Sequence, residues 1–353
     1  MIKYTQQSFH KNCKFMFTSI YNRILNYCNS VYKSPSSKTV KKMKEESARW
    51  FIDLLQQRYS TGTSDSPCIH TGNKCVIIMV DNTIYNPGLA DKLRGILSIY
   101  SLCKEKHIEF ELTEYLLPNK INWIIEQEKI KYSLSDSKIV VIDTLPNIHA
   151  SRQSIIDKKI FDDTVLNSQY LQYHIYTNSI IHTQAFPNLF RELFTPSEKL
   201  QSLIDLQHKN IGEKYVAASF RFLELLGDFK DSEGMDEMLP PREQKLLIEQ
   251  CYIELKKFID TLPEFYKILV TSDSERFLTK ASTLPRTYII PGKVIHIRYK
   301  TTDTSAYMKT FLDMFLLSGA ESLVLFKTGK MYNSGFPRLA SQIGNKHFKI
   351  HEF

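Results

Sequence analysis

The chain has 353 residues, of which 42% are hydrophobic and 24% are charged, and its formal net charge is +8. This balance excludes a disordered or low-complexity protein, and the length is sufficient for two domains with buried cores. The six cysteines show no CxxC spacing and no apolar segment of the signal-peptide type opens the chain. We therefore expect a reduced, cytoplasmic protein.

The excess positive charge lies in residues 1–60, which hold 11 Lys and Arg against three acidic residues. Apolar residues from Phe9 to Val31 recur at helical spacing, with polar and basic residues on the other side. The pattern predicts a basic amphipathic helical segment that is too polar to span a bilayer. Residues 9–49 could make peripheral contact with an anionic membrane at its inner face, or could pack on the rest of the protein. No basic stripe with interleaved aromatic residues follows, so we expect no nucleic-acid partner.

A short linker, residues 61–73, separates this segment from a region in which strands and helices alternate. In this region we expect an apolar strand over residues 75–80, a helix over 89–106 and a second buried strand over 139–142. Residues 150–210 are predicted to be mostly helical, and their histidines lack metal-ligand spacing. Residues 74–209 are therefore predicted to form a first Rossmann-like domain with a helical bridge.

Residues 210–353 show a second series of alternating strands and helices. The predicted strands are residues 215–220, 268–271, 288–290 and 322–326, and the predicted helices are 243–262, 305–318, and two that open at 274 and 334. This series indicates a second doubly wound domain with a parallel sheet. The predicted fold class is thus α/β, with two Rossmann-like domains and an N-terminal helical extension.

Polar residues follow three of the predicted strands in the second domain. Arg221 ends the first strand, Asp273 ends the second, and Ser334-Gly335 opens the helix after the last strand. In a doubly wound sheet these positions meet in one crevice, where a cation, a carboxylate and free helix amides suit a nucleotide. Two plainer readings remain: Arg221 could pair with Glu224 or Asp228, and Asp273 could cap the helix that follows it.

Five motifs in order resemble those of the fucosyltransferase superfamily that contains the α1,2-, α1,6- and protein-O-fucosyltransferases. Ser219-Phe220-Arg221 lies where that superfamily has a His-x-Arg motif. The other matching segments are residues 86–95, 270–274, 313–324 and 334–340.

The resemblance implies a GT-B architecture, in which two Rossmann-like domains face a cleft. It also implies that the acceptor glycan binds mainly to the first domain, that a GDP-sugar binds mainly to the second, and that no metal is required. By the match, Arg221 would hold the diphosphate and stabilise the departing GDP. Asp313 would contact guanine, Asp273 the nucleoside, and Ser334, Gly335 and Phe336 the β-phosphate.

Two positions depart from the family pattern. The usual His is Ser219, which leaves the identity of the donor nucleotide open. The second Arg of the α1,6 subgroup is Phe222, so the linkage made by that subgroup is not transferred.

Inversion at an anomeric carbon needs a base that takes the proton from the acceptor hydroxyl. The sequence nominates three carboxylates for this role, Glu224 and Asp228 slightly ahead of Asp91. Asp91 lies in the first-domain motif, at a position where many relatives carry Asn.

The sequence therefore predicts an inverting, metal-independent glycosyltransferase that transfers fucose from GDP-fucose to a glycan acceptor in surface polysaccharide biosynthesis. The alternatives are a transferase of another GDP-sugar and an inactive glycan- or nucleotide-binding protein with this fold. A third reading, a phosphoaspartyl phosphatase built on Asp81-Asn82-Thr83, is weak because a second Asp is expected where the chain has Thr83.

Overall fold

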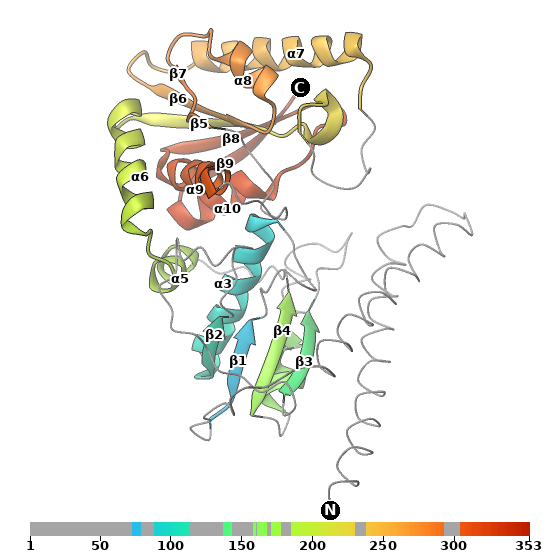
Figure 1. Cartoon of the computed structure of the whole chain (residues 1–353), viewed down its shortest axis with the longest axis vertical. Helices are drawn as coiled ribbons and strands as arrows, with labels where there is room; N and C mark the ends of the chain where they lie inside the picture. Colours follow the sequence, from blue (N-terminus) through green and yellow to red (C-terminus); the bar gives the residue numbers. More distant parts are fainter. Residues whose placement is uncertain are drawn as a thin grey trace, which may run out of the picture. The chain divides into compact units, whose positions relative to one another are not determined.

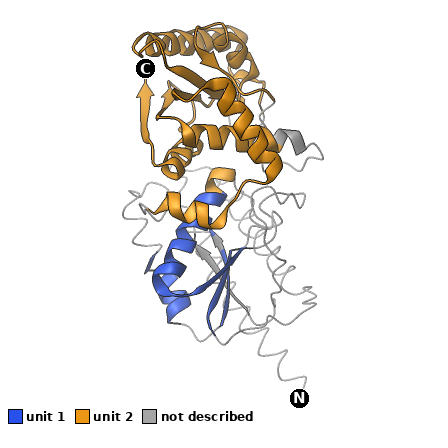
Figure 2. Ribbon diagram, turned by 90° about the vertical axis from the view of Figure 1, so that its left-hand side faces the viewer, with its two compact units in different colours: residues 1–87, 92–116, 128–183 blue, residues 88–91, 117–127, 184–353 orange. Residues whose placement is uncertain are grey.

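The computed structural model describes residues 73–78, 88–112, 137–142, 158–159, 161–167, 171–177, 185–229, 238–292 and 304–353. The predicted basic segment, nearly all of the linker and Asp81 lie outside these ranges. Contacts divide the chain into two units (Figure 2). Unit 1 comprises Met1–Pro87, Lys92–Leu116 and Glu128–Thr183, and unit 2 comprises Gly88–Asp91, Leu117–Gln127 and Gln184–Phe353. In the described stretches, no helix has the length and apolar character of a membrane span.

Unit 1 contains a parallel sheet with the strand order β2-β1-β4-β3. Its elements are β1 (Cys75–Ile78), α3 (Leu89–Lys106), β2 (Glu109–Leu112), β3 (Ser137–Ile142), a short π-helix (Asp162–Leu166) and β4 (Gln172–Thr177). All four residues of β1 are buried, as expected for a central parallel strand. The predicted helix over residues 89–106 matches the bounds of α3.

The prediction of a mostly helical stretch over residues 150–210 is wrong in one place, because β4 is a strand there and pairs with both β1 and β3. Its residues alternate between polar and apolar in a way typical of strands, and His174 is expected from the sequence to be a structural or a surface histidine. Gln172 and His174 are both fully buried, and Gln172 Nε2 lies 2.8 Å from His174 Nε2. Mutual hydrogen bonding lets two polar side chains occupy a core-facing row.

Unit 2 is built on a five-stranded parallel sheet with the order β7-β6-β5-β8-β9. The strands are β5 (Tyr215–Phe220), β6 (Lys267–Ser272), β7 (Thr287–Tyr288), β8 (Ser322–Lys327) and β9 (His347–Glu352). The helices are α5 (Phe186–Leu193), α6 (Glu198–Ile211), α7 (Pro241–Asp260), α8 (Glu275–Ala281), α9 (Thr304–Gly319) and α10 (Gly335–Gly344), and a 3-10 helix covers Leu223–Leu226. Figure 1 shows α7 and α8 on one face of this sheet and α9 and α10 on the other. The order changes direction at β5, so the carboxyl ends of β5, β6 and β8 border a topological switch point.

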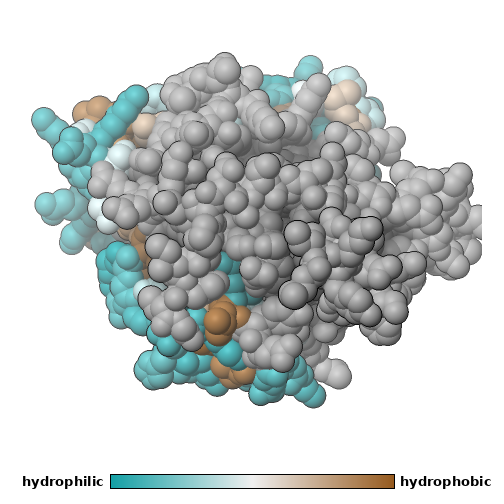
Figure 3. Space-filling view, turned by 60° about the horizontal axis from the view of Figure 1, so that its bottom comes forward, coloured by the Kyte–Doolittle hydropathy of each residue, from teal (hydrophilic) through white to brown (hydrophobic). Residues whose placement is uncertain are grey.

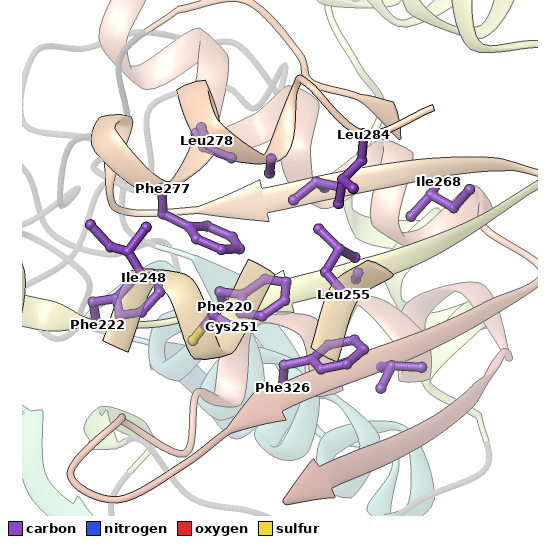
Figure 4. Close-up of a cluster of buried hydrophobic side chains, with 14 of the residues drawn as sticks. Phe220, Phe222, Ile248, Cys251, Leu255, Ile268, Phe277, Leu278, Leu284 and Phe326 are labelled. Atoms are coloured by element: carbon purple, nitrogen blue, oxygen red, sulfur yellow. The ribbon is translucent and has the colours of Figure 1, made fainter. Parts of the chain in front are cut away.

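The core of unit 2 fixes the ends of these strands. Under α7, Phe220 stacks on Phe326 with ring centroids 4.8 Å apart and lies 4.4 Å from the ring of Phe277 (Figure 4). Cys251 and Leu255 of α7 are fully buried against the same cluster. Aromatic side chains of this size dominate core energetics, so Phe220 anchors the strand one residue before Arg221.

On the opposite face, α10 packs closely against α9 at Gly344. A Cβ at this position would lie 2.0 Å from the carbonyl oxygen of Ser318. Only glycine allows the two helix backbones to approach so closely. The approach sets where α10 lies on α9, and thereby the position of its first turn.

On the face that Figure 3 presents, hydrophilic colours predominate among the described residues, and hydrophobic residues form small patches. Isolated exposed apolar residues of this kind are ordinary for a globular protein.

Candidate functional site

A pocket in unit 2 gathers most of the residues that the sequence nominated. It is lined by residues 88–91, by the ends of β5 and β6, by Thr310 and Asp313 of α9, and by Tyr332 with residues 334–336. All of these segments belong to unit 2 in the division by contacts. Of the nominated residues, the pocket brings together Asp91, Ser219, Arg221, Asp273, Asp313, Ser334, Gly335 and Phe336. The pocket lies at the carboxyl ends of parallel strands, where doubly wound sheets bind ligands.

Arg221 is held from two sides. Its Nε lies 3.4 Å from Oδ2 of Asp273, and its guanidinium carbon lies 4.6 Å from the centre of the Phe229 ring. The side chain keeps 19% of its surface exposed and lines the pocket. A guanidinium that stacks on a ring and pairs with a carboxylate is already oriented before any ligand arrives. The plainer reading of Arg221, a pair with Glu224 or Asp228, is wrong, because the recorded partner is Asp273.

Asp273 also shapes the backbone that follows Arg221. Its carboxylate accepts the N–H groups of Phe222 at 2.9 Å and Leu223 at 2.8 Å. Burial raises the pKa of Asp273, while Arg221 and these two N–H donors oppose the rise. The plainer reading of Asp273 as a helix cap is also wrong, because the α8 cap is Ser274, whose side chain accepts from the Phe277 amide.

Leu223 adopts a left-handed conformation, with φ of 54°. This conformation costs a residue with a Cβ about 1–2 kcal/mol, so surrounding contacts must hold it. The hydrogen bond to Asp273 is such a contact. The chain therefore turns sharply just after Arg221, and this turn depends on the buried carboxylate.

Ser219 replaces the histidine of the resembling motif. It is 7% exposed, lines the pocket, and its Oγ accepts a hydrogen bond from Thr271 Oγ1 at 3.1 Å. The neighbouring strands thus present two small hydroxyl groups where the related motif has one imidazole. The pocket floor is wider and more neutral at this point than a histidine would make it.

The first turn of α10 forms another wall of the pocket. Ser334 is the N-cap residue, and its side chain accepts the Phe336 amide at 3.3 Å. The amides of Gly335 and Phe336 open the helix, where the helix dipole favours an anion. The loop before α10 is tied to the Arg221 strand, because the Tyr332 amide donates to the Arg221 carbonyl at 3.1 Å. Arg221 and the start of α10 are therefore connected by backbone hydrogen bonding.

Asp313 lies in the middle of α9 and contributes a buried carboxylate to the pocket. It forms an ion pair with Lys309, one turn earlier on the same helix, and the side chains of both residues are almost fully buried. Burial raises the pKa of Asp313, and the charge and hydrogen bond of Lys309 oppose the rise.

The three carboxylates considered for the base differ in position. Asp91, in the first turn of α3, lines the pocket, whereas Glu224 and Asp228 are not among the lining residues. Asp228 Oδ2 accepts from Ser274 Oγ at 2.7 Å and from the Arg276 amide at 3.1 Å. Asp228 therefore supports the start of α8 in this structure.

Sequence reasoning missed Tyr332, Thr310 and Lys309. Tyr332 is 52% exposed and lines the pocket, and its position in the loop just before the nominated residues 334–336 was a usable signal. No sequence pattern marked Lys309 as part of the site, because burial of a lysine cannot be inferred from a helical pattern. No group of three or more His, Cys, Asp and Glu side chains that could hold a metal ion occurs among the residues that the structure describes.

Fucosyltransferase structures resemble this chain in three dimensions. A mutant of Arabidopsis thaliana FUT1 in complex with GDP matches with a TM-score of 0.50 at 14% identity, covering 91% of this chain and 80% of that one. The fucosyltransferase NodZ from Bradyrhizobium matches with a TM-score of 0.48 at 12% identity, over 76% of this chain and 92% of that one. POFUT1 in complex with GDP-fucose matches at 0.45 and 8%, over 81% of this chain and 99% of that one. Neither a family model nor a curated protein matches the sequence.

The match to the plant enzyme shows that the chain has the fold of GT-B fucosyltransferases, with two parallel sheets. The resemblance drawn from the five motifs is thus confirmed at the level of the fold. The N-terminal helical extension of that prediction lies outside the described residues.

Proposed function

We propose that this protein is an inverting, metal-independent glycosyltransferase that transfers fucose from GDP-fucose to a glycan. The observation that carries the proposal is the joint placement of Arg221, the first turn of α10 and the buried carboxylate of Asp313 in one pocket. These groups match two parts of a guanosine diphosphate. Arg221 and the first turn of α10 suit the diphosphate, and the Asp313 carboxylate can accept from the N–H edge of guanine.

Arg221 is the residue on which the chemistry depends most. Breaking a bond between a sugar and a diphosphate leaves negative charge on the diphosphate, and a fixed cation stabilises that charge. The guanidinium is held by Asp273 and Phe229, so little reorganisation is needed as the charge develops. Loss of one such donor typically raises the barrier by about 3 kcal/mol. The amide of Gly335, at the start of α10, would add a second, uncharged contact to the same phosphates.

Among the three carboxylates, we propose Asp91 as the base. Asp91 lines the pocket, whereas Asp228 is engaged at the start of α8. A base must come within hydrogen-bond reach of the acceptor hydroxyl, directly or through one water. This ranking reverses the sequence-based preference for Glu224 and Asp228.

The acceptor and the setting of the reaction are further parts of the proposal. The acceptor would be a glycan that binds mainly to the first domain, and the product would enter a surface polysaccharide. Residues 9–49 would bring the enzyme to an anionic membrane surface through their basic amphipathic pattern.

A donor turnover assay tests the proposal. GDP release from GDP-fucose and GDP-mannose is measured in EDTA with a panel of glycan acceptors, and NMR of the product reads the anomeric configuration. We expect acceptor-dependent release from GDP-fucose with inversion, abolished in Arg221→Ala. Tight GDP binding without turnover on any acceptor would favour a glycan- or nucleotide-binding protein that has lost catalysis. Turnover that requires an added metal would contradict the proposed mechanism.

A further inference from the structure

The pair of Lys309 and Asp313 is unusual for its position inside α9. Both side chains are nearly buried, at 3% and 6% exposure. Desolvating two charges costs more than the pair usually regains, and apolar residues of similar size are often as stable or more so. α9 is otherwise a largely apolar helix packed between α6, α10 and β6. A stabilising role therefore does not explain the pair, whereas a role in the pocket that Asp313 lines does.

The alkyl stem of Lys309 lies near Gly292. A Cβ added at Gly292 would lie 3.5 Å from Lys309 Cβ and 3.6 Å from its Cδ, which is an ordinary van der Waals distance. Gly292 has φ of 111°, a conformation that strongly favours glycine. The ammonium group of Lys309 pairs with Asp313 Oδ1, one turn along the same helix.

Lys309 is the charge that opposes the desolvation of Asp313. Other charged groups near α9 are placed differently. Asp91, Arg221 and Asp273 share the pocket with Asp313. On the helices packed against α9, Arg338 of α10 lies over Phe348, His208 of α6 lies near Tyr215 and Gly319, and the remaining charged residues of α6 are exposed. On β6, the charged residue is Lys267, which is exposed at the opposite end of the strand.

We propose that Lys309 is a positioning and specificity-determining residue, which keeps Asp313 ionised and fixed so that the pocket selects a purine with adjacent N–H donors. This inference rests on the proposed function, because it deepens the recognition of the nucleotide. Guanine offers N1–H and an exocyclic N–H₂ group side by side, and only an ionised carboxylate accepts from both. A protonated Asp313 would be an acceptor on one oxygen only and would lose much of this preference.

The sign of the pH dependence follows from this arrangement. A carboxyl group whose pKa is raised is protonated below that pKa, so GDP binding that needs the carboxylate weakens as the pH falls through it. Removing Lys309 removes the opposing charge, so the pKa rises further and binding weakens at a higher pH. Each unit by which the pKa of Asp313 rises moves the pH midpoint of GDP binding up by one unit. Below that midpoint, GDP then binds about tenfold more weakly.

The test compares GDP, IDP and ADP binding from about pH 5 to about pH 9 in the wild type, Lys309→Met, Asp313→Asn and a control. IDP lacks the exocyclic amino group, so the ratio of GDP to IDP affinity reports on Asp313 and not on the diphosphate. The matched control is Lys256→Met, because Lys256 and Asp260 form a pair with the same spacing on the exposed face of α7. Thermal melting confirms that each variant is folded.

We expect Lys309→Met to move the midpoint for GDP binding upward by about one pH unit or more, and to reduce the GDP-to-IDP ratio below that midpoint. Asp313→Asn should remove both the midpoint and most of the ratio, and Lys256→Met should change neither. Should Lys309→Met not fold, Lys309→Gln is measured in its place, and an unmoved midpoint in that folded variant overturns the inference. If folded Lys309→Met binds GDP with the same pH midpoint as the wild type, this inference is overturned and the proposed function is not. No nucleotide binding by the wild type overturns the proposed function and this inference together.

Discussion

The carboxylate of Asp273 accepts the amide N–H of Leu223 at 2.8 Å, and Leu223 is held in a left-handed conformation, with φ of 54°. The same oxygen, Oδ2, lies 3.4 Å from Nε of Arg221. One buried side chain thus fixes both the cation that faces the pocket and the turn that follows it. The site is built into the end of β5 and does not depend on a separate loop to supply the cation.

Replacing Asp273 with Ala should destabilise unit 2. The change leaves the N–H groups of Phe222 and Leu223 buried without their acceptor, and such a loss costs about 1–3 kcal/mol for each group. Urea denaturation followed by circular dichroism measures the change in the free energy of unfolding. Asp260→Ala is the control, because Asp260 is an exposed residue of α7 and should have no measurable effect. Equal stabilities of the two variants would contradict this account of the turn.

Replacing Arg221 with Lys should lower kcat/KM for GDP-fucose by about two orders of magnitude. Lysine keeps the charge but cannot both pair with Asp273 and stack on Phe229 in the way the guanidinium does. Steady-state kinetics of donor turnover measures the effect. Arg338→Lys is the control, since Arg338 also lies over a phenylalanine ring but is not among the pocket-lining residues. A wild-type kcat/KM in Arg221→Lys would show that donor turnover does not need the guanidinium of Arg221.

Replacing Asp91 with Asn should lower kcat by about a hundredfold or more, because a general base typically contributes that much. Donor affinity should stay close to that of the wild type. Glu224→Gln should leave kcat nearly unchanged. Asp228→Ala should lower stability through the start of α8 while the folded fraction stays active. The opposite order, with Asp91→Asn fully active and Glu224→Gln inactive, would assign the base to Glu224.

Replacing Gly344 with Ala should separate α10 from α9, because a Cβ there would lie 2.0 Å from the Ser318 carbonyl oxygen. Backbone cannot yield as a flexible side chain does, and overpacking of this kind costs about 1–3 kcal/mol or more. The first turn of α10 should also shift, so GDP affinity should fall together with the melting temperature. Arg338→Ala is the control on the same helix, because the Arg338 side chain is exposed and does not line the pocket. Unchanged melting and affinity in Gly344→Ala would show that α10 is positioned in another way.

The strand ends of unit 2 were predictable because β5, β6 and β8 are continuous apolar runs, each followed by a polar residue. Parallel topology then places Arg221, Asp273 and Ser334 together, as the pocket confirms. The β4 strand was missed because two of its buried residues, Gln172 and His174, are polar and hydrogen-bond to each other, a pairing that a pattern of hydrophobicity does not encode.

It was harder to predict which residues pair with each other in the site than to predict which residues line it. Arg221 has acidic residues three and seven positions away in sequence, yet it pairs with Asp273, 52 positions away. Pairing of this kind is set by the register of neighbouring strands, β5 with β6, and not by local spacing. The same limit applies to Lys309, whose burial depends on how α9 packs against its neighbours and not on local spacing.

The decisive experiment on the proposed nucleotide site is calorimetric titration with GDP and UDP in EDTA, using the wild type, Arg221→Ala and Arg338→Ala. We expect the wild type and Arg338→Ala to bind GDP more tightly than UDP without a metal, and Arg221→Ala to lose most of this affinity. A preference for UDP, binding that appears only with an added metal, or equal GDP affinity in all three proteins would contradict the proposed site.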